Sequence, residues 1–263
     1  MRKYLTILRL GWLDAVEYRT EFFVSLFGWV IRLFIAVFLW LAVAKAQGGH
    51  IGDYSYGKLM TYFFLVQMLS GFIFTRVGVD IALDIYRGDI ANYLLKPVNY
   101  LIFRLMHEMS KNVFRTLIGV VIFGSAIALF FEGIPLGLWK IPFALLAICI
   151  GYLINFAIVA IIALSSFWIT NATRLTFIYF GILTIFSGMI VPIDLFPPQL
   201  KIIFSQLPMS YIFYFPIRIL QAPLYLAEFG QEMIMGAAYT GIFLLLLRLV
   251  YIQGVKHFEG VGR

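Results

Sequence analysis

Six mostly apolar stretches alternate with polar and charged segments along the chain. A helix needs about 17–25 such residues to cross the hydrocarbon core of a bilayer. We therefore expect an all-α polytopic membrane protein with six transmembrane helices in a single domain over residues 1–263. The stretches cover about 22–44, 59–79, 113–131, 141–169, 175–191 and 234–251.

The first 21 residues combine an apolar stripe with charged positions. Leu5, Leu8, Trp12 and Val16 recur at helical spacing, and basic and acidic residues lie between them. This pattern is typical of an amphipathic helix in the membrane interface. A charged segment leading into the first span is the alternative interpretation.

Residues 80–112 alternate charged positions with Ile, Leu and Tyr. Gly88 is able to end a helix, and Pro97 disfavours a helical conformation for the residue before it. We expect a short helix, a turn near residues 87–89, a second short helix to Leu95, and a new helix after Pro97. Such an amphipathic hairpin would dock on a soluble partner; a solvated loop is the alternative.

Residues 192–233 contain six prolines yet are rich in Ile, Leu, Phe and Tyr. A water-exposed linker would be more polar. Irregular backbone is tolerated at membrane depth only where protein covers it. The sequence therefore predicts broken helices that enter the outer leaflet, turn back, and cover the outer end of the helix bundle.

The composition agrees with a membrane location, because 62% of the residues are hydrophobic and 13% are charged. Soluble chains average about 45–50% and about 25%. This excludes a soluble enzyme, a secreted protein and a disordered chain. Fourteen of the 20 Lys and Arg residues lie in segments on one side of the expected spans and five on the other, with Arg32 inside a span. The positive-inside rule then places both termini in the cytoplasm, and the net charge of +7 records orientation, so that no nucleic-acid partner is expected.

No constellation in the sequence favours an enzyme. The chain has no G-x-x-x-x-G-K-[ST], G-x-S-x-G or H-E-x-x-H pattern,. His50, His107 and His257 fall in separate segments, and Cys149 is the single cysteine. We expect no catalytic residue, no metal site and no cofactor bound by this chain.

Three polar residues fall inside the expected spans at similar depth: Arg32, Gln67 and Asn155. Charges at this depth cost about 2.5–3.5 kcal/mol on insertion scales and usually face protein or water. The favoured interpretation is a hydrogen-bonded layer between helices, or an Arg32 that reaches the interface. A role in a substrate path is the alternative.

The second and fifth spans are rich in aromatic and Met residues. Such stripes are most often packing or lipid-facing residues, but they also suit a path for an amphiphilic substrate, because Met and aromatic surfaces adapt to varied shapes. The candidates for this path are Phe64, Met68, Phe72, Phe180, Phe186 and Met189.

The order of these segments resembles a type-2 ABC exporter permease, the transmembrane subunit of a bacterial ABC transporter. The resemblance covers nearly the whole chain, and its motifs are loose. They are residues 187–192 (SGMIVP), 196–200 (FPPQL), 207–211 (LPMSY), 87–90 (RGDI), 93–98 (YLLKPV) and 257–262 (HFEGVG).

The resemblance implies a division of labour. A separate ABC ATPase subunit would bind ATP and Mg, and a second permease, identical or a related paralogue, would complete a pathway lined by the second and fifth spans. The protein would be a multi-pass component of the bacterial inner (plasma) membrane. Contacts with the ATPase are implied for Arg9, Glu17, Asp84, Tyr86, Arg87, Asp89 and Leu94.

Other functions remain open on the sequence. The coupling subunit of an ABC importer would have long cytoplasmic helices with docking motifs similar to Ala-Arg-Gly. Only Arg87-Gly88 is similar to such a motif. A non-transporting membrane scaffold would leave the hairpin at 80–97 without a purpose. A membrane-embedded enzyme lacks an acid, base or nucleophile cluster. The apolar, aromatic spans favour a hydrophobic or amphiphilic substrate such as a drug, lipid or peptide over a sugar polymer.

Overall fold

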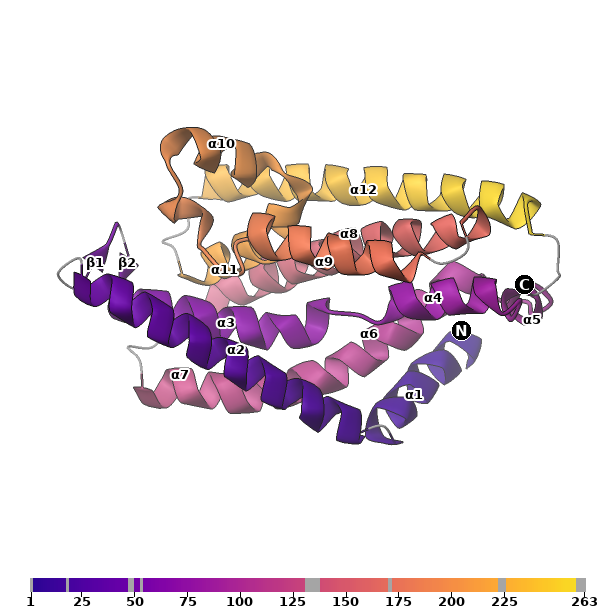
Figure 1. Ribbon diagram of the computed structural model, residues 1–263, viewed down its shortest axis with the longest axis horizontal. Helices are drawn as coiled ribbons and strands as arrows, with labels where there is room; N and C mark the ends of the chain where they lie inside the picture. Colours follow the sequence, from indigo (N-terminus) through magenta and orange to yellow (C-terminus); the bar gives the residue numbers. More distant parts are fainter. Residues whose placement is uncertain are drawn as a thin grey trace.

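The computed structural model describes residues 2–17, 19–46, 50–52, 54–130, 138–169, 172–221 and 226–258. Almost all of these residues are helical, and most helices run along the long axis of the molecule (Figure 1). The long helices are α1 (Arg2–Glu17), α2 (Arg19–Ala46), α3 (Tyr56–Ile73), α6 (Tyr100–Gly119), α8 (Ile141–Leu164), α9 (Thr173–Phe186) and α12 (Leu226–Lys256).

Shorter elements connect these helices. Two-residue strands, β1 (His50–Ile51) and β2 (Tyr54–Ser55), pair antiparallel after α2. A π-helical turn over Val120–Gly124 joins α6 to α7, and 3-10 turns flank α8 and α10. The short helices are α4 (Val77–Tyr86), α5 (Ile90–Leu94), α7 (Ser125–Phe130), α10 (Pro198–Gln206) and α11 (Tyr214–Gln221).

Five helical segments within the described part of the chain are long and apolar enough to cross a membrane, and α9 is a shorter apolar helix. The protein is therefore an all-α, multi-pass membrane protein. The five segments are Leu26–Ala46, Tyr56–Tyr86, Tyr100–Ile127, Ile141–Phe167 and Phe229–Lys256.

Three of the expected spans have different bounds in the structure. The third spanning segment begins at Tyr100 rather than near residue 113, since it includes the helix expected after Pro97, α6, which the Asn99 side chain caps by accepting a bond from the Ile102 amide at 3.1 Å. The fifth, α9, has only 14 residues and is followed by a turn in which Gly188 has a φ of +84°. The second is interrupted over residues 74–76, between α3 and α4.

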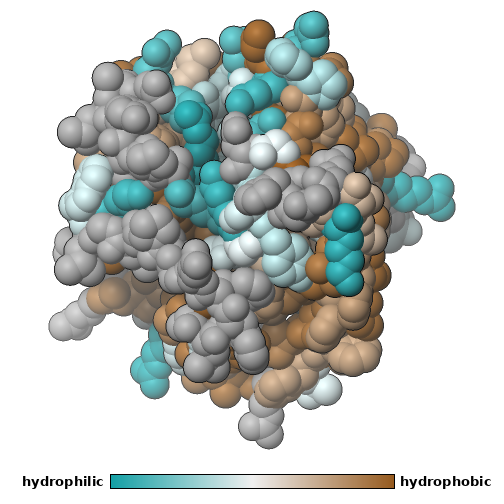
Figure 2. All heavy atoms as spheres, turned by 90° about the vertical axis from the view of Figure 1, so that its left-hand side faces the viewer, coloured by the Kyte–Doolittle hydropathy of each residue, from teal (hydrophilic) through white to brown (hydrophobic). Residues whose placement is uncertain are grey.

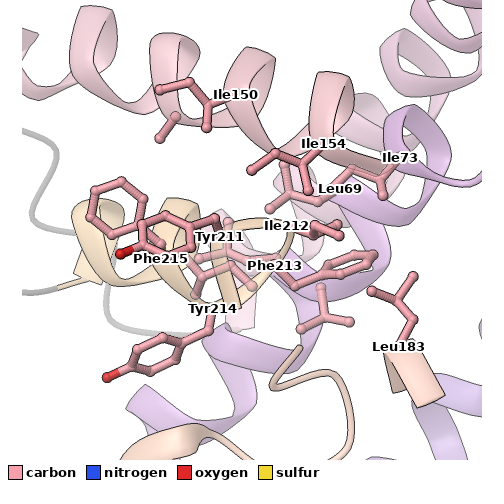
Figure 3. Packing of buried hydrophobic residues seen from close by; sticks show 14 of the residues in the cluster. Leu69, Ile73, Ile150, Ile154, Leu183, Tyr211, Ile212, Phe213, Tyr214 and Phe215 are labelled. Atoms are coloured by element: carbon pink, nitrogen blue, oxygen red, sulfur yellow. The ribbon is translucent and has the colours of Figure 1, made fainter. Parts of the chain in front are cut away.

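The core lies around α8, which packs against α3, α4, α9, α11 and α12. The part of the expected outer segment that holds α11 and the turn before it is folded into this core, whereas α10 has no buried residue. Ile212 and Phe213, from the turn before α11, are fully buried, and Figure 3 shows them between Ile154 of α8, Leu69 of α3 and Leu183 of α9. The dense packing required of irregular backbone at membrane depth is thus present.

The two ends of the bundle carry different elements. α1, α4, α5 and the end of α12 lie at the right of Figure 1, and β1, β2 and α10 lie at the left. Figure 2 faces the left-hand end, where hydrophilic residues gather near the middle and hydrophobic residues cover the lower right flank. An apolar flank with a more polar end face is the distribution that a spanning bundle needs.

α8 approaches the outer segment so closely that only glycine fits at position 151. A Cβ atom there would lie 2.6 Å from the Tyr211 carbonyl oxygen and 3.0 Å from Ile212 Cα. Both atoms belong to backbone, which cannot swing aside as a flexible side chain does. Gly241 of α12 is a useful comparison, because a Cβ there meets nothing within 4 Å.

We expect Gly151→Ala to destabilise the purified protein by about 1–3 kcal/mol, the usual cost of overpacking a core. Gly241→Ala should be neutral or stabilise by about 0.5–1 kcal/mol, because alanine favours the helix. Thermal unfolding in detergent provides the measurement. Equal melting temperatures for the two variants would contradict this close packing.

Candidate functional site

α1 packs along the first half of α6, held by polar contacts. His107 Nε2 lies 2.9 Å from Asp14 Oδ2, and Ser110 Oγ donates to the Leu8 carbonyl at 2.6 Å. Ile7, Gly11 and Ala15, spaced four residues apart, form the buried face of α1. The exposed side of α1 carries most of the predicted apolar stripe, namely Leu5, Trp12 and Val16.

A tight turn joins α4 to α5 at the same end of the molecule. The Arg87 amide donates to the Leu83 carbonyl at 2.9 Å, and the Gly88 amide donates to the Ile85 carbonyl at 3.2 Å. Gly88 has a φ of +79°, a conformation that glycine adopts without strain and that ends helices. The helix, turn and short helix expected across this segment are therefore present.

Arg104 of α6 holds the α4 side of this hairpin in place. Its guanidinium contacts the Asp84 carboxylate and lies 3.6 Å from Asp80 Oδ2. The Tyr100 hydroxyl also donates to Asp84, and the Arg104 guanidinium lies 5.5 Å from the centre of the Tyr93 ring. The Arg104 side chain is 9% exposed, so the arm formed by α4 and α5 is bound to α6 through a largely buried ion pair.

A polar pocket of about 370 Å³ lies between α1, α4 and α6. It contains carboxylates from both α1 and α4 and basic groups from α6. We call it the inner pocket. Its lining residues are Asp14, Asp80, Leu83, Asp84, Arg87, Tyr93, Phe103, Arg104, His107 and Lys111.

The structure separates the implied coupling residues into two groups. Asp84 lies inside, as the partner of Arg104 and Tyr100, so it supports the arm. The others are exposed, on α1 and around the turn between α4 and α5: Arg9, Glu17, Tyr86, Arg87, Asp89 and Leu94.

Sequence reasoning missed the residues that hold the arm in place. Tyr100, Arg104, His107 and Lys111 follow one another at spacings of three or four on α6, which places them on one face of that helix. The helix after Pro97 was expected, but the shared face of these four residues was not used to predict a contact with α4. Residues 259–262 of the C-terminal motif lie outside the described residues.

The three polar residues predicted to form one layer have different surroundings. Asn155 Nδ2 donates to the Ile73 carbonyl at 2.8 Å, and Asn155 Oδ1 accepts from the Tyr179 hydroxyl at 2.8 Å. Gln67 is buried in α3, whereas Arg32 is exposed on α2. Asn155 therefore forms hydrogen bonds with the end of α3 and with α9, and not with Arg32.

The six aromatic and Met candidates are partly buried and fall into separate ring clusters. Phe64 packs edge-on against Phe123, with ring centres 6.3 Å apart, and Phe72 lies 4.7 Å from Tyr152. Phe186 contacts Phe204 of α10, with ring centres 5.0 Å apart. The remaining three are Met68, Phe180 and Met189, which pack against the hydrophobic core.

Asp194 organises the opposite end of the bundle. It accepts hydrogen bonds from the Tyr54 and Tyr214 hydroxyls at 2.9 and 2.8 Å, and Lys201 Nζ lies 2.8 Å away. Burial alone raises the pKa of this carboxyl, but the bonds from Lys201, Tyr214 and Tyr54 outweigh burial and lower the pKa below its ordinary value. Tyr62 closes the same region by donating to the Gly188 carbonyl at 2.7 Å.

We expect Arg104→Leu to destabilise the protein by about 3–5 kcal/mol, because it leaves carboxylates buried without their cation. Arg104→Lys should lose less stability, because it keeps the positive charge. Arg87→Ala, at an exposed position, should change stability by no more than about 0.5 kcal/mol. Unfolding in detergent measures all three; an Arg104→Leu variant as stable as Arg87→Ala would show that the ion pair does not hold the arm.

Asp194 should make stability pH-dependent. A carboxyl with a lowered pKa stabilises the folded state above the pKa of the unfolded state, and this contribution is lost as pH falls through the folded value. The stability difference between the unchanged protein and Asp194→Asn should thus be constant above about pH 5 and shrink below about pH 4. Melting temperatures across this range test the expectation, and a difference that grows on acidification would refute it.

Comparison with known proteins agrees with this architecture. A family model described as "ABC-2 family transporter protein" matches residues 30–262. None of the curated proteins matches the chain. The match begins within α2 and extends through α12, and so covers the hairpin between α4 and α6 and the folded outer segment. The chain belongs to the ABC-2 transporter family and is a membrane component of an ABC transporter.

Proposed function

We propose that the protein is the permease subunit of a type-2 ABC exporter, with ATP hydrolysed by a separate ABC ATPase. In this proposal α9, together with the residues that follow it, serves as the fifth of six spans. Both termini lie in the cytoplasm of a bacterial cell, as the distribution of basic residues indicates. The whole chain forms one permease domain, with α1 in the inner interface and residues 192–233 as a re-entrant outer segment.

The observation that carries the proposal is the supported hairpin of α4 and α5. Its turn exposes Tyr86, Arg87 and Asp89, while Arg104 and Tyr100 bind its base to α6. An exposed tip on a rigid base suits the transmission of force from a soluble partner. A solvated loop would not need the buried ion pair.

α1 would provide the second contact with the ATPase. The His107–Asp14 and Ser110–Leu8 contacts connect α1 to α6, the helix that also holds the arm. Arg9 and Glu17 are exposed on α1, the helix that begins at the same end of the molecule as α5 (Figure 1). A load on either element would therefore reach α6.

The pathway would lie between this chain and a second permease, identical or related. The exposed surfaces of α2 and α9 are strongly apolar, with Phe34 and Phe38 on α2 and Phe177 and Ile182 on α9 among the exposed residues. Such surfaces suit lipid, a second permease, and a hydrophobic or amphiphilic substrate such as a drug, lipid or peptide. Arg32, exposed among apolar residues on α2, would face protein or water in the assembly.

The proposal predicts a nucleotide-independent contact between residue 87 and the ATPase that co-purifies with the chain. Arg87→Cys, made with Cys149→Ala so that it is the single thiol, would carry a benzophenone probe. Illumination should give one covalent adduct with the ATPase, visible by electrophoresis and mass spectrometry. The hairpin tip is expected to touch the ATPase in every state, because force must pass through it throughout the cycle.

Ile202→Cys provides the matched control. This residue is 61% exposed on α10, at the opposite end of the bundle (Figure 1), and should give no adduct with the ATPase. Absence of an adduct at position 87 without nucleotide, with ADP and with a non-hydrolysable ATP analogue would contradict the proposed coupling role. An adduct at position 202 alone would reverse the assigned orientation.

A further inference from the structure

The second spanning segment is interrupted at residues 74–76. α3 has 18 residues and is about 27 Å long at 1.5 Å per residue, so it nearly crosses the hydrocarbon by itself. Phe74 ends it in an extended conformation, with a φ of −70° and a ψ of 126°. The chain contains no proline between α3 and α4, so tertiary contacts must hold the break open.

Two asparagine amides satisfy the end of α3. Asn112 of α6 donates from Nδ2 to the Phe72 carbonyl at 2.8 Å, and Asn155 of α8 donates to the Ile73 carbonyl at 2.8 Å. Asn112 and Asn155 are both fully buried. Backbone carbonyls without a helical partner are costly in an apolar environment, so the amides stabilise the interrupted form over a continuous helix.

The start of α4 is supported separately. Thr75 Oγ1 accepts from the Val77 amide at 3.2 Å and donates to Glu108 Oε2 at 3.0 Å. Glu108 is fully buried, and its other oxygen lies 2.7 Å from Lys111 Nζ. Glu108 and Asn112 both belong to α6, so this helix holds both sides of the break, and residues 74–76 between them lie outside α3 and α4.

α4 begins directly against α8 and α9. A Cβ atom on Gly78 would lie 2.6 Å from Val159 and 3.1 Å from the Thr176 side chain, so the backbone of α4 touches both helices. The Asn155 amide that holds the end of α3 also accepts a bond from Tyr179 of α9 through its oxygen, at 2.8 Å. A single side chain therefore connects the break to α9.

We propose that residues 74–76 form a hinge, and that Asn155 is a positioning residue that transmits bending of this hinge to α9 through Tyr179. The inference rests on the proposed function, in which the ATPase moves the arm of α4 and α5. Asn112 and Asn155 keep the carbonyls of Phe72 and Ile73 bound while α4 tilts. The Asn155–Tyr179 bond makes α9, the short fifth apolar helix, follow that tilt.

The test measures movement of the arm and of α9 together, in the complex with its ATPase. Spin labels are placed at Leu95→Cys beside α5 and Gly181→Cys on α9, with Cys149→Ala. Leu95 is 86% exposed, and a Cβ at Gly181 meets nothing within 4 Å. A third label at Ile202→Cys serves as the outer reference. The distances from position 202 to positions 95 and 181 are measured with ADP bound and again with a non-hydrolysable ATP analogue bound.

In the unsubstituted complex, the distance from position 181 to position 202 should change by about 2–5 Å, the scale of helix shifts in switching proteins. Tyr179→Phe should abolish this change, while ATP hydrolysis and the movement of position 95 persist. Thr184→Val is the matched control, since Thr184 donates within α9 to the Phe180 carbonyl at 2.6 Å; it should leave the change intact. Melting temperatures confirm that each variant is folded.

The outcomes separate the hinge from the proposed function. If the complex forms and hydrolyses ATP but Tyr179→Phe retains the full change at α9, the transmission through Asn155 is overturned. The same holds if Thr184→Val abolishes the change as fully as Tyr179→Phe does. If no ATPase binds the unsubstituted chain, the proposed function fails, and the hinge proposal fails with it.

Discussion

Backbone carbonyls that are buried away from water need hydrogen-bond donors, and this need determines how α3 is joined to α6 and α8. Where α3 stops, the carbonyls of Phe72 and Ile73 are bound by amides from α6 and α8. An unbound carbonyl in hydrocarbon costs several kcal/mol, so α6 and α8 cannot separate from α3 without a large penalty. The position of the break, and with it the direction of α4, follows from those two contacts.

The same constraint explains the end of the bundle that holds the segment after α9. The apolar segment after α9 turns back into the bundle and places Ile212 and Phe213 against α3 and α8 (Figure 3). Its irregular stretches are held by side chains, with Tyr62 bound to the Gly188 carbonyl and Trp40 Nε1 to the Ile190 carbonyl at 3.2 Å. Aromatic hydroxyl and indole groups thus support the turn that shortens α9.

Hydropathy predicted where apolar helices occur, because lipid selects long runs of apolar residues whatever their neighbours. Hydropathy placed only the apolar part of this helix, from about residue 113, whereas Pro97 predicted its start; the internal role of Arg104, Glu108 and Lys111 is visible only when their partners are known. Those partners, Asp84 and Thr75, are distant in sequence, and hydropathy carries no information on pairing. Gly88 predicted the turn that exposes Arg87 and Asp89. The contact of Asp84 with α6 could be recognised only from the folded structure.

The π-helical turn at Val120–Gly124 has a consequence for the surface of the third spanning segment. One additional residue in a turn rotates everything beyond it by about 100° relative to an uninterrupted α-helix. The polar face of α6 that meets α1 and α4 is therefore not continued by the corresponding positions of α7. α3 packs against both α6 and this turn, and Phe123 and Ile127 are buried beyond its start, so the rotation re-aims the end of the third segment while the segment stays packed on α3.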